Sequence, residues 1–330
     1  MKRLILTLAA VLLASGCNQD PGPLTVSTDS VPLFPDDPGR RNLDQLTYQG
    51  GIEISSETPG FGGWSAIEIS PDGERLLAIS DGGAWLTATL EYDRNGHLDG
   101  LSHPRMAPLR DARGEPLEGP AGDAEGLAPL GGGRYAVSFE RDHRIQVYDI
   151  GEDWSGIDAA LPEPYTAPPG LNRLRDNGGI EALAPAENGL WAGIEHPAVD
   201  GQPHTIWHLG DGDAVPHSMH LSDGFGLTAL ARAAPGELIA VERYWSRSTG
   251  NRIRLTRIAD SALEASAAGG PGLGPDLLGE LDTSMTVDNF EGAAIAEVNG
   301  EPHLFLISDD NFNAEQRTLL LSFSLRSGDG

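Results

Sequence analysis

Short apolar stretches with alternating polar positions recur along the chain, and glycine-rich or polar turns separate them. Five segments share one plan: a glycine-rich approach, a short strand, a turn, a second strand that ends in an acidic residue, and a third strand. Short apolar runs bounded by turn residues predict β-strands, and no segment carries a sustained 3.6-residue apolar period. We therefore expect an all-β protein with few helices. The segments cover residues 62–93, 123–150, 178–197 continued by 204–209, 226–245 continued by 252–258, and 288–312 continued by 318–325.

The repeat has the length of one propeller blade. A four-stranded blade with outer loops of variable length fits separations of 47 to 63 residues between equivalent positions. We predict a single β-propeller of four-stranded blades, with five blades, or six if a stretch between segments hides a degenerate one. A β-sandwich is the rival architecture, but it does not explain the repeated acidic positions. The first strands align at Ser65, Glu125, Glu181, Thr228 and Glu291.

The fifth segment is not followed by an outer strand, whereas residues 43–55 form a strand pattern ahead of the first segment. We expect this N-terminal strand to complete the last blade and close the ring. The propeller domain is accordingly predicted over residues 43–330.

A second set of acidic residues ends the second strand of each segment. The start of one antiparallel strand lies beside the end of the next, so both positions of a segment should meet at one face of the ring, near the central channel. Carboxylates suit Ca²⁺ or Mg²⁺ and repel one another without a cation or an arginine. We predict Ca²⁺ as the cofactor; alternatively, the acids accept backbone hydrogen bonds in turns. The candidate metal ligands are Asp81, Glu125, Glu140, Glu181, Glu195, Glu242, Glu291 and Asp309.

Basic residues shortly after these acids are candidate substrate clamps, namely Arg141, His143 and Arg243. They are suited to a phosphate or carboxylate that bridges a metal, and their alternative role is to pair with the neighbouring acids. The chain has no G-x-S-x-G or H-E-x-x-H motif, so the catalytic residues themselves are not identified.

Charge limits the partners. The 330 residues include 22 Lys plus Arg against 49 Asp plus Glu, and a formal net charge of −27 repels a nucleic-acid backbone. We expect no nucleic acid, a monomeric protein, and as partner either a small anionic ester substrate or a ligand of the cell envelope.

The N-terminus has the pattern of a lipoprotein signal peptide. Lys2 and Arg3 precede an apolar run over residues 4–14, which is too short to span a bilayer, and small residues lead into Cys17, the only cysteine. We predict a signal peptide over residues 1–16, a lipidated Cys17, and a flexible tether, rich in Pro and Asp, over residues 17–42. An ordinary signal peptide is the alternative. The expected location is the bacterial envelope, on the periplasmic face of the outer membrane, with membrane contact through the lipid anchor only.

The stretches DAEGLA, SFE, IEALA, DNFEGAA and LFLISDDNF resemble the phytase-like family of secreted bacterial proteins, described by "esterase-like activity of phytase". The resemblance covers about residues 45 to 325. It implies a β-propeller and a metal-dependent phosphoesterase or esterase activity.

Three functions fit these features. The first is a Ca²⁺-dependent hydrolase of phosphate esters at the acidic face. The second is a non-catalytic propeller, stabilised by metal, that binds an envelope glycan or protein. The third is a lactonase or carboxyl ester hydrolase, which differs from the first only in its substrate.

Overall fold

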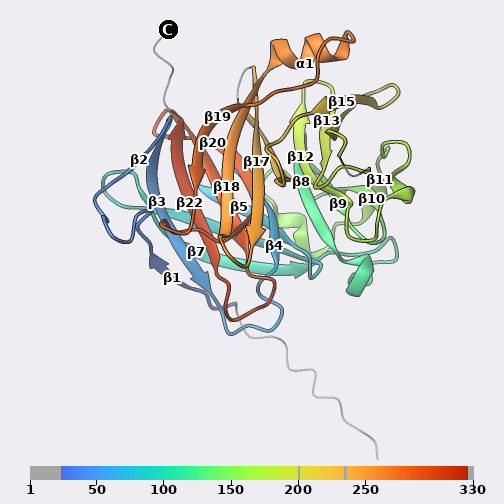
Figure 1. Ribbon diagram of the computed structural model, residues 1–330. Helices are drawn as coiled ribbons and strands as arrows, with labels where there is room; N and C mark the ends of the chain where they lie inside the picture. The colour runs from blue at the N-terminus through green and yellow to red at the C-terminus, as the bar shows by residue number, and fades with distance from the viewer. Residues whose placement is uncertain (1–23, 200, 234–235, 326–330) are drawn as a thin grey trace, which may run out of the picture.

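The protein folds as a β-propeller, as the repeat predicts (Figure 1). The computed structural model describes residues 24–199, 201–233 and 236–325. Three of the sheets are separate and have four strands each. A fourth sheet has ten strands and contains two further four-stranded units. These two units are joined by a single parallel bridge between Gly50 and Leu98. We call each four-stranded unit a blade and number the blades in chain order of their inner strands.

The inner strands surround the central axis. Each of them contacts the inner strand of the next blade, and β20 contacts β4, so the described inner strands form a ring. They are β4 (Trp64–Ile69), β8 (Ala124–Gly131), β12 (Ile180–Ala186), β16 (Gly226–Ala233) and β20 (Asn289–Val298).

The second and third strands continue each blade outward as antiparallel neighbours. Second strands are buried on both faces between adjacent blades, which explains their nearly continuous apolar runs such as LLAIS and LFLIS. The second strands are β5 (Arg75–Ser80), β9 (Arg134–Phe139), β13 (Gly189–Ile194), β17 (Glu237–Ser246) and β21 (Glu301–Asp309); the third strands are β6 (Ala84–Tyr92), β10 (Arg144–Asp149), β14 (His204–Leu209), β18 (Gly250–Ala259) and β22 (Thr318–Leu325).

The N-terminal strand closes the propeller, and this prediction is confirmed. Strand β3 pairs antiparallel with β22 and so supplies the outer strand of the fifth blade; Figure 1 shows the blue β3 beside the red β22. Because the first and last parts of the chain share one sheet, the ring is held together by hydrogen bonds as well as by packing. The outer strands are β7 (Leu98–Pro108), β11 (Pro162–Pro164), β15 (Val215–Met219), β19 (Asp276–Leu281) and β3 (Leu46–Ser55).

The hydrophobic core is divided among the interfaces between neighbouring blades. Each cluster of buried apolar side chains joins two adjacent blades, for example Trp85 of the first blade with Phe139 and Tyr148 of the second. Removal of such side chains from water supplies most of the driving force for folding, so the blades stabilise one another.

The predicted tether is ordered over its described part, which corrects the expectation of a flexible segment up to residue 42. Strand β1 (Ser27–Ser30) pairs with β3, and Leu33 and Phe34 are buried in the core between the fourth and fifth blades. The Leu33 carbonyl accepts a hydrogen bond from Thr286 N at 2.8 Å. Burial of these two apolar side chains holds the segment against the propeller, although prolines and aspartates surround them in the sequence. Further along, the short strand β2 (Asn42–Leu43) pairs with β3. The predicted signal peptide and Cys17 lie outside the described residues.

Helices are few, as expected. Among the described residues the only α-helix is α1 (Asp260–Ala267), between β18 and β19, and no helix there is long and apolar enough to cross a membrane. Short 3₁₀ turns cover Gly119–Ala121, Ser155–Asp158 and Leu171–Arg173.

Candidate functional site

Every described inner strand carries a β-bulge, and its extra residue is the one on which the sequence repeats align. In β8, for example, Ala124 pairs with Phe139 and Gly126 with Ser138, which leaves Glu125 without a partner. A bulge bends the strand and redirects the side chain of the unpaired residue. Three glutamates on bulges line a cavity at the mouth of the channel, whereas the bulges of blades one and four carry hydroxyl residues. The five unpaired residues are Ser65, Glu125, Glu181, Thr228 and Glu291.

The glycines that follow two of the bulge glutamates allow close packing between blades. A Cβ on Gly126 would lie 2.9 Å from Leu183 Cγ, and one on Gly292 would lie 2.9 Å from Ala66 Cα in the next blade. The bulge of blade two is also linked to blade three, because Ser138 Oγ accepts a hydrogen bond from Gly126 N at 2.9 Å and donates one to Ile180 O at 2.7 Å. In each Glu-Gly pair, the glutamate therefore lines the cavity and the glycine allows the neighbouring blade to pack closely.

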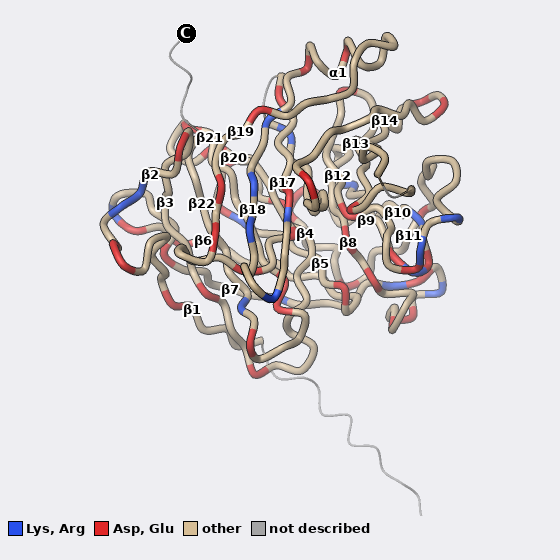
Figure 2. The backbone as a smooth tube through the Cα atoms, in the orientation of Figure 1, with Lys and Arg blue, Asp and Glu red and all other residues tan. Residues whose placement is uncertain are grey.

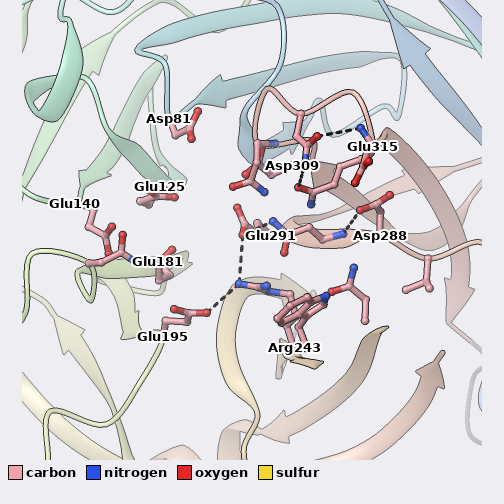
Figure 3. Close-up of a pocket in the computed structure, with 18 of the residues that line it drawn as sticks. Asp81, Glu125, Glu140, Glu181, Glu195, Arg243, Asp288, Glu291, Asp309 and Glu315 are labelled. Atoms are coloured by element: carbon pink, nitrogen blue, oxygen red, sulfur yellow. Dashed lines mark hydrogen bonds and ion pairs between the residues drawn. The ribbon is translucent and has the colours of Figure 1, made fainter. Parts of the chain in front are cut away.

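Second-strand acids meet the bulge glutamates, as antiparallel pairing requires. Asp81, Glu140 and Glu195 directly follow their strands, and Asp309 is the last residue of β21. Hydrogen bonds from Glu140 N to Asp123 O at 2.8 Å and from Asp81 N to Gly63 O at 2.9 Å hold the paired strand ends together. These carboxylates surround a cavity of about 740 Å³ (Figure 3). Of the predicted ligands, the cavity is lined by Asp81, Glu125, Glu140, Glu181, Glu195, Glu291 and Asp309.

Glu242 does not line the cavity, which corrects its predicted place in the constellation. Its carboxylate accepts hydrogen bonds from Thr256 Oγ1 at 2.9 Å and from Ser222 N at 3.3 Å, and Arg254 Nε lies 4.0 Å away. Strand β17 continues to Ser246, so Glu242 stands inside a strand and alternation turns it away from the cavity. The arginines of the neighbouring β18, blue in Figure 2, provide its cationic surroundings.

The candidate clamps divide in the same way. Arg141 and Arg243 line the cavity. His143 does not: its Nε2 lies 2.9 Å from Arg175 O, and its ring stands beside Gly179. The sequence rule, which selects basic residues shortly after an acidic position, therefore identified the two cavity arginines correctly. It could not show that the His143 side chain lies outside the cavity.

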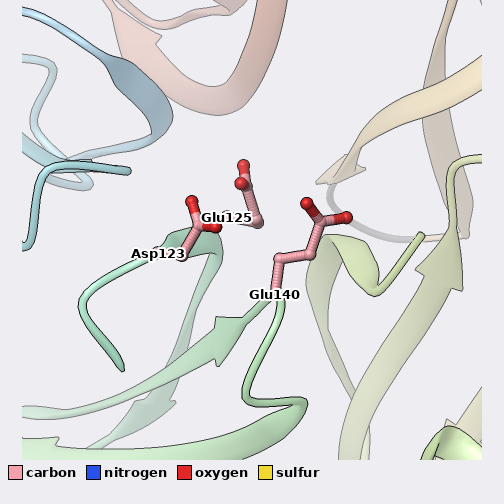
Figure 4. A group of neighbouring side chains, drawn as sticks. All are labelled: Asp123, Glu125 and Glu140. Atoms are coloured by element: carbon pink, nitrogen blue, oxygen red, sulfur yellow. The ribbon is translucent and has the colours of Figure 1, made fainter. Parts of the chain in front are cut away.

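Sequence reasoning missed Asp123, which completes the tightest carboxylate group. Asp123, Glu125 and Glu140 each offer one oxygen, and these oxygens all lie within 4.8 Å of one another (Figure 4). Ca²⁺ binds oxygen at 2.3–2.6 Å, so oxygens on one ion are separated by up to about 5 Å. The group therefore fits a Ca²⁺-sized ion. The DAE stretch carried the signal, because it places a second carboxylate two residues before the aligned glutamate.

A second observation agrees with a cation site in this cavity. Asp81 Oδ1 is buried and, among the described residues, has no hydrogen-bond partner. A buried carboxylate oxygen without a partner costs free energy, which a bound cation or water removes.

Burial and mutual repulsion raise the pKa values of the cavity carboxylates. Burial, followed by the neighbouring carboxylates, raises the pKa of Glu125 and Glu181 well above the usual value. The same causes raise the pKa of Glu291 to about 8, of Asp81 to about 7 and of Asp309 to about 6. Several of these groups therefore hold protons at neutral pH, and a divalent cation would replace those protons.

Both cavity arginines are paired with acids. Arg243 Nη2 lies 3.1 Å from Glu195 Oε1 and 3.5 Å from Glu291 Oε1 (Figure 3), and Arg243 Nε is buried without a hydrogen-bond partner among the described residues. Arg141 Nε lies 2.6 Å from Asp123 Oδ2, with its side chain half exposed. The arginines offset part of the negative charge and leave most of it for a cation.

Fold and site define a β-propeller with an acidic cavity at the mouth of its central channel. The family description "Phytase-like: Esterase-like activity of phytase" matches residues 59–312. The chain therefore belongs to the phytase-like family. Its matched region contains all the carboxylates described above.

Other comparisons give distant likenesses. None of the curated proteins matches the chain. Among solved structures, U3-55K is similar with 13% identity, coverage of 90% of this chain and 94% of that chain, and a TM-score of 0.40. The Pan2 WD40 domain of Neurospora crassa is similar with 9% identity, coverage of 87% and 97%, and a TM-score of 0.39. The Malassezia sympodialis allergen Mala s 1 has 14% identity, coverage of 86% and 91%, and a TM-score of 0.38.

Proposed function

We propose that the protein is a Ca²⁺-dependent hydrolase that cleaves small anionic esters, phosphate monoesters foremost, in the acidic cavity. The observation that carries this proposal is the convergence of oxygens from Asp123, Glu125 and Glu140 on one ion-sized space, in a chain of the phytase-like family. These three residues would hold the ion, which supplies positive charge to a phosphoryl oxygen and acidifies a bound water.

The remaining cavity residues have distinct tasks in this proposal. Arg243, on the opposite wall, orients the phosphoryl group through its guanidinium donors. Glu291, whose pKa of about 8 makes it a base near pH 8, accepts a proton from the attacking water, and the Arg243 guanidinium beside it favours its ionised form. Glu181, whose pKa burial raises, is the proton donor for the leaving oxygen.

The chemistry balances without a further reactant. A water oxygen forms a bond to phosphorus, the bond from phosphorus to the ester oxygen breaks, and that oxygen takes the proton from Glu181. The proton from the water passes to Glu291 and then back to Glu181. One ester and one water give one alcohol and one phosphate, and no group is oxidised or reduced.

Turnover of generic esters tests the proposal. We expect the purified protein to hydrolyse p-nitrophenyl phosphate, and more weakly p-nitrophenyl acetate, with Ca²⁺ and not with EDTA. Glu125→Gln should lower kcat/KM roughly tenfold, since the loss of one ligand weakens the ion site. Glu242→Gln is the control: it makes the same change at a second-strand acidic position outside the cavity and should leave kcat/KM unchanged. If Ca²⁺ binds and neither ester is cleaved, the protein is the non-catalytic binding propeller instead.

We further propose that the protein is anchored to the bacterial envelope through a lipid on Cys17. The small residues before the only cysteine support this proposal. In a bacterial host, the wild-type protein should sediment with membranes, and Cys17→Ser should release it to the soluble fraction. Ser15→Ala, which keeps a small residue before the cysteine, should remain with the membranes. A Cys17→Ser protein that still sediments with membranes would contradict the anchor.

A further inference from the structure

The fourth blade builds a wall that the other blades lack. Strands β5, β9 and β13 end one residue before their acidic position and β21 ends on it, whereas β17 runs on for four residues after Glu242. Strand β18 pairs with this extension as far as Ser246 and Gly250. The β17–β18 hairpin therefore extends past the strand ends that carry the cavity acids.

Alternation along the extension directs its side chains to two sides. Arg243 and Trp245 line the cavity, while Tyr244, between them, packs against Phe225 with ring centroids 5.5 Å apart. On the next strand Gly250 packs so closely that a Cβ there would lie 2.5 Å from Thr283 Cγ2. These contacts fix the hairpin on both sides, so its cavity face is held in place before a ligand arrives.

That face presents an aromatic surface and an unpaired acceptor. The Trp245 side chain is 57% exposed although it lines the cavity. Asn251, directly opposite Trp245 in the hairpin, also lines the cavity, and its Oδ1 is buried without a hydrogen-bond partner among the described residues. An exposed indole gains nothing for folding, and a buried acceptor without a donor costs free energy, so both features point to a ligand.

The cavity lining is also rich in neutral amides, which both donate and accept hydrogen bonds. An aromatic side chain can pack against the C–H groups on one face of a saturated ring, and amides can hydrogen-bond to hydroxyls at the edge of that ring. The cavity amides are Asn177, Asn251, Asn289, Asn311, Asn313 and Gln316.

The charges limit how many anionic groups the ligand carries. Among the described residues that line the cavity, only Arg141 and Arg243 are basic, and both already pair with carboxylates. One phosphate can be held between a bound cation and Arg243, but further phosphates would face uncompensated carboxylates. The part of the substrate at the rim is therefore uncharged.

We propose that Trp245 and Asn251 form a subsite for a sugar ring, and that the substrate is a sugar ester with a single anionic group. The ring packs its C–H face on Trp245, and a ring hydroxyl donates a hydrogen bond to Asn251 Oδ1 after the side-chain amide rotates its oxygen toward the cavity. This inference rests on the proposed hydrolase function and names the substrate class for that site.

The test compares a cyclic and a linear monoester of equal charge, glucose 6-phosphate and glycerol 3-phosphate, with the full-length protein loaded with Ca²⁺. Trp245→Ala should lower kcat/KM for glucose 6-phosphate about tenfold, mainly through KM, and leave glycerol 3-phosphate within about twofold, because an aromatic packing contact is worth close to that factor. Trp245→Phe should retain most of the activity. Asn251→Ala should show the same selectivity as Trp245→Ala. Leu161→Ala, which changes another exposed apolar side chain outside the cavity, should affect neither substrate.

Calorimetric binding of both esters separates the two proposals. Cleavage of both esters with equal losses, or no loss, in Trp245→Ala would overturn the sugar subsite and leave the hydrolase intact. Absence of cleavage together with Trp245-dependent binding of glucose 6-phosphate would overturn the hydrolase and keep the subsite. Absence of both would overturn both proposals.

Discussion

Addition of Ca²⁺ to the metal-free protein at pH 8 is expected to raise its melting temperature by about 6 °C, and by far less at pH 5. A ligand at about 1,000 times its Kd stabilises the folded state by about 4 kcal/mol, which for a chain of this size corresponds to that shift. Differential scanning calorimetry with Ca²⁺ or EDTA at both pH values measures it.

The difference between the two pH values follows from the raised pKa values. Asp309, Asp81 and Glu291 have pKa values of about 6, 7 and 8 in the folded protein, above those of an unfolded chain. Between about pH 4 and pH 8 the folded state therefore binds more protons than the unfolded state, and the metal-free protein loses stability as the pH rises. At pH 5 these protons compete with Ca²⁺, whereas at pH 8 the cation meets ionised carboxylates.

Two controls make this prediction specific. Glu125→Gln should reduce the Ca²⁺-dependent shift, and Glu242→Gln should preserve it because Glu242 lies outside the cavity. A shift of equal size at pH 5 and pH 8, or no shift at all, would contradict Ca²⁺ binding by the cavity carboxylates.

Replacement of Arg243 by alanine is expected to destabilise the metal-free protein by about 3 kcal/mol at pH 8, because removal of one partner leaves enclosed charges unpaired. Arg243 contacts both Glu195 and Glu291 and is largely buried. The loss should shrink at pH 5, where Glu291 holds a proton, and Ca²⁺ should restore part of it at pH 8. Urea denaturation with EDTA measures these differences.

The same variant should lower kcat/KM for p-nitrophenyl phosphate about 100-fold, the usual effect of removing a donor aimed at developing charge. Arg105→Ala is the control for stability. Both members of its ion pair with Asp158 are exposed, so the loss should stay below about 1 kcal/mol. Equal destabilisation by both substitutions would show that the position of Arg243 between two carboxylates has no special importance.

Much of the architecture was accessible from the sequence because the repeat is local. Alternating strands, Gly-rich turns and the recurring acid identified the propeller, and the unpaired strand at residues 43–55 identified how the ring closes. The repeat could not reveal that its aligned residues sit on β-bulges, since a bulge is defined by the pairing of two strands.

Deviations from the repeat were less accessible. Glu242 matches the pattern perfectly, yet a four-residue extension of β17 turns it toward Thr256. Asp123 falls outside the aligned positions, and only the approach of its oxygen to those of Glu125 and Glu140 in space brings it into the carboxylate group. Leu33 and Phe34 stand among prolines and aspartates, and their burial depends on a surface formed by the last blades.

The sequence by itself determined the blade plan, the ring closure and the gathering of acids at one end of the channel, because strand alternation and antiparallel pairing are properties of short stretches. Tertiary structure decided which acids face the cavity, which arginines neutralise them, and that Trp245 and Asn251 form its rim. Those outcomes depend on where each strand ends relative to its neighbours and on how closely separate blades approach. The contacts involved join residues that are far apart in the chain, so a short stretch of sequence does not reveal them.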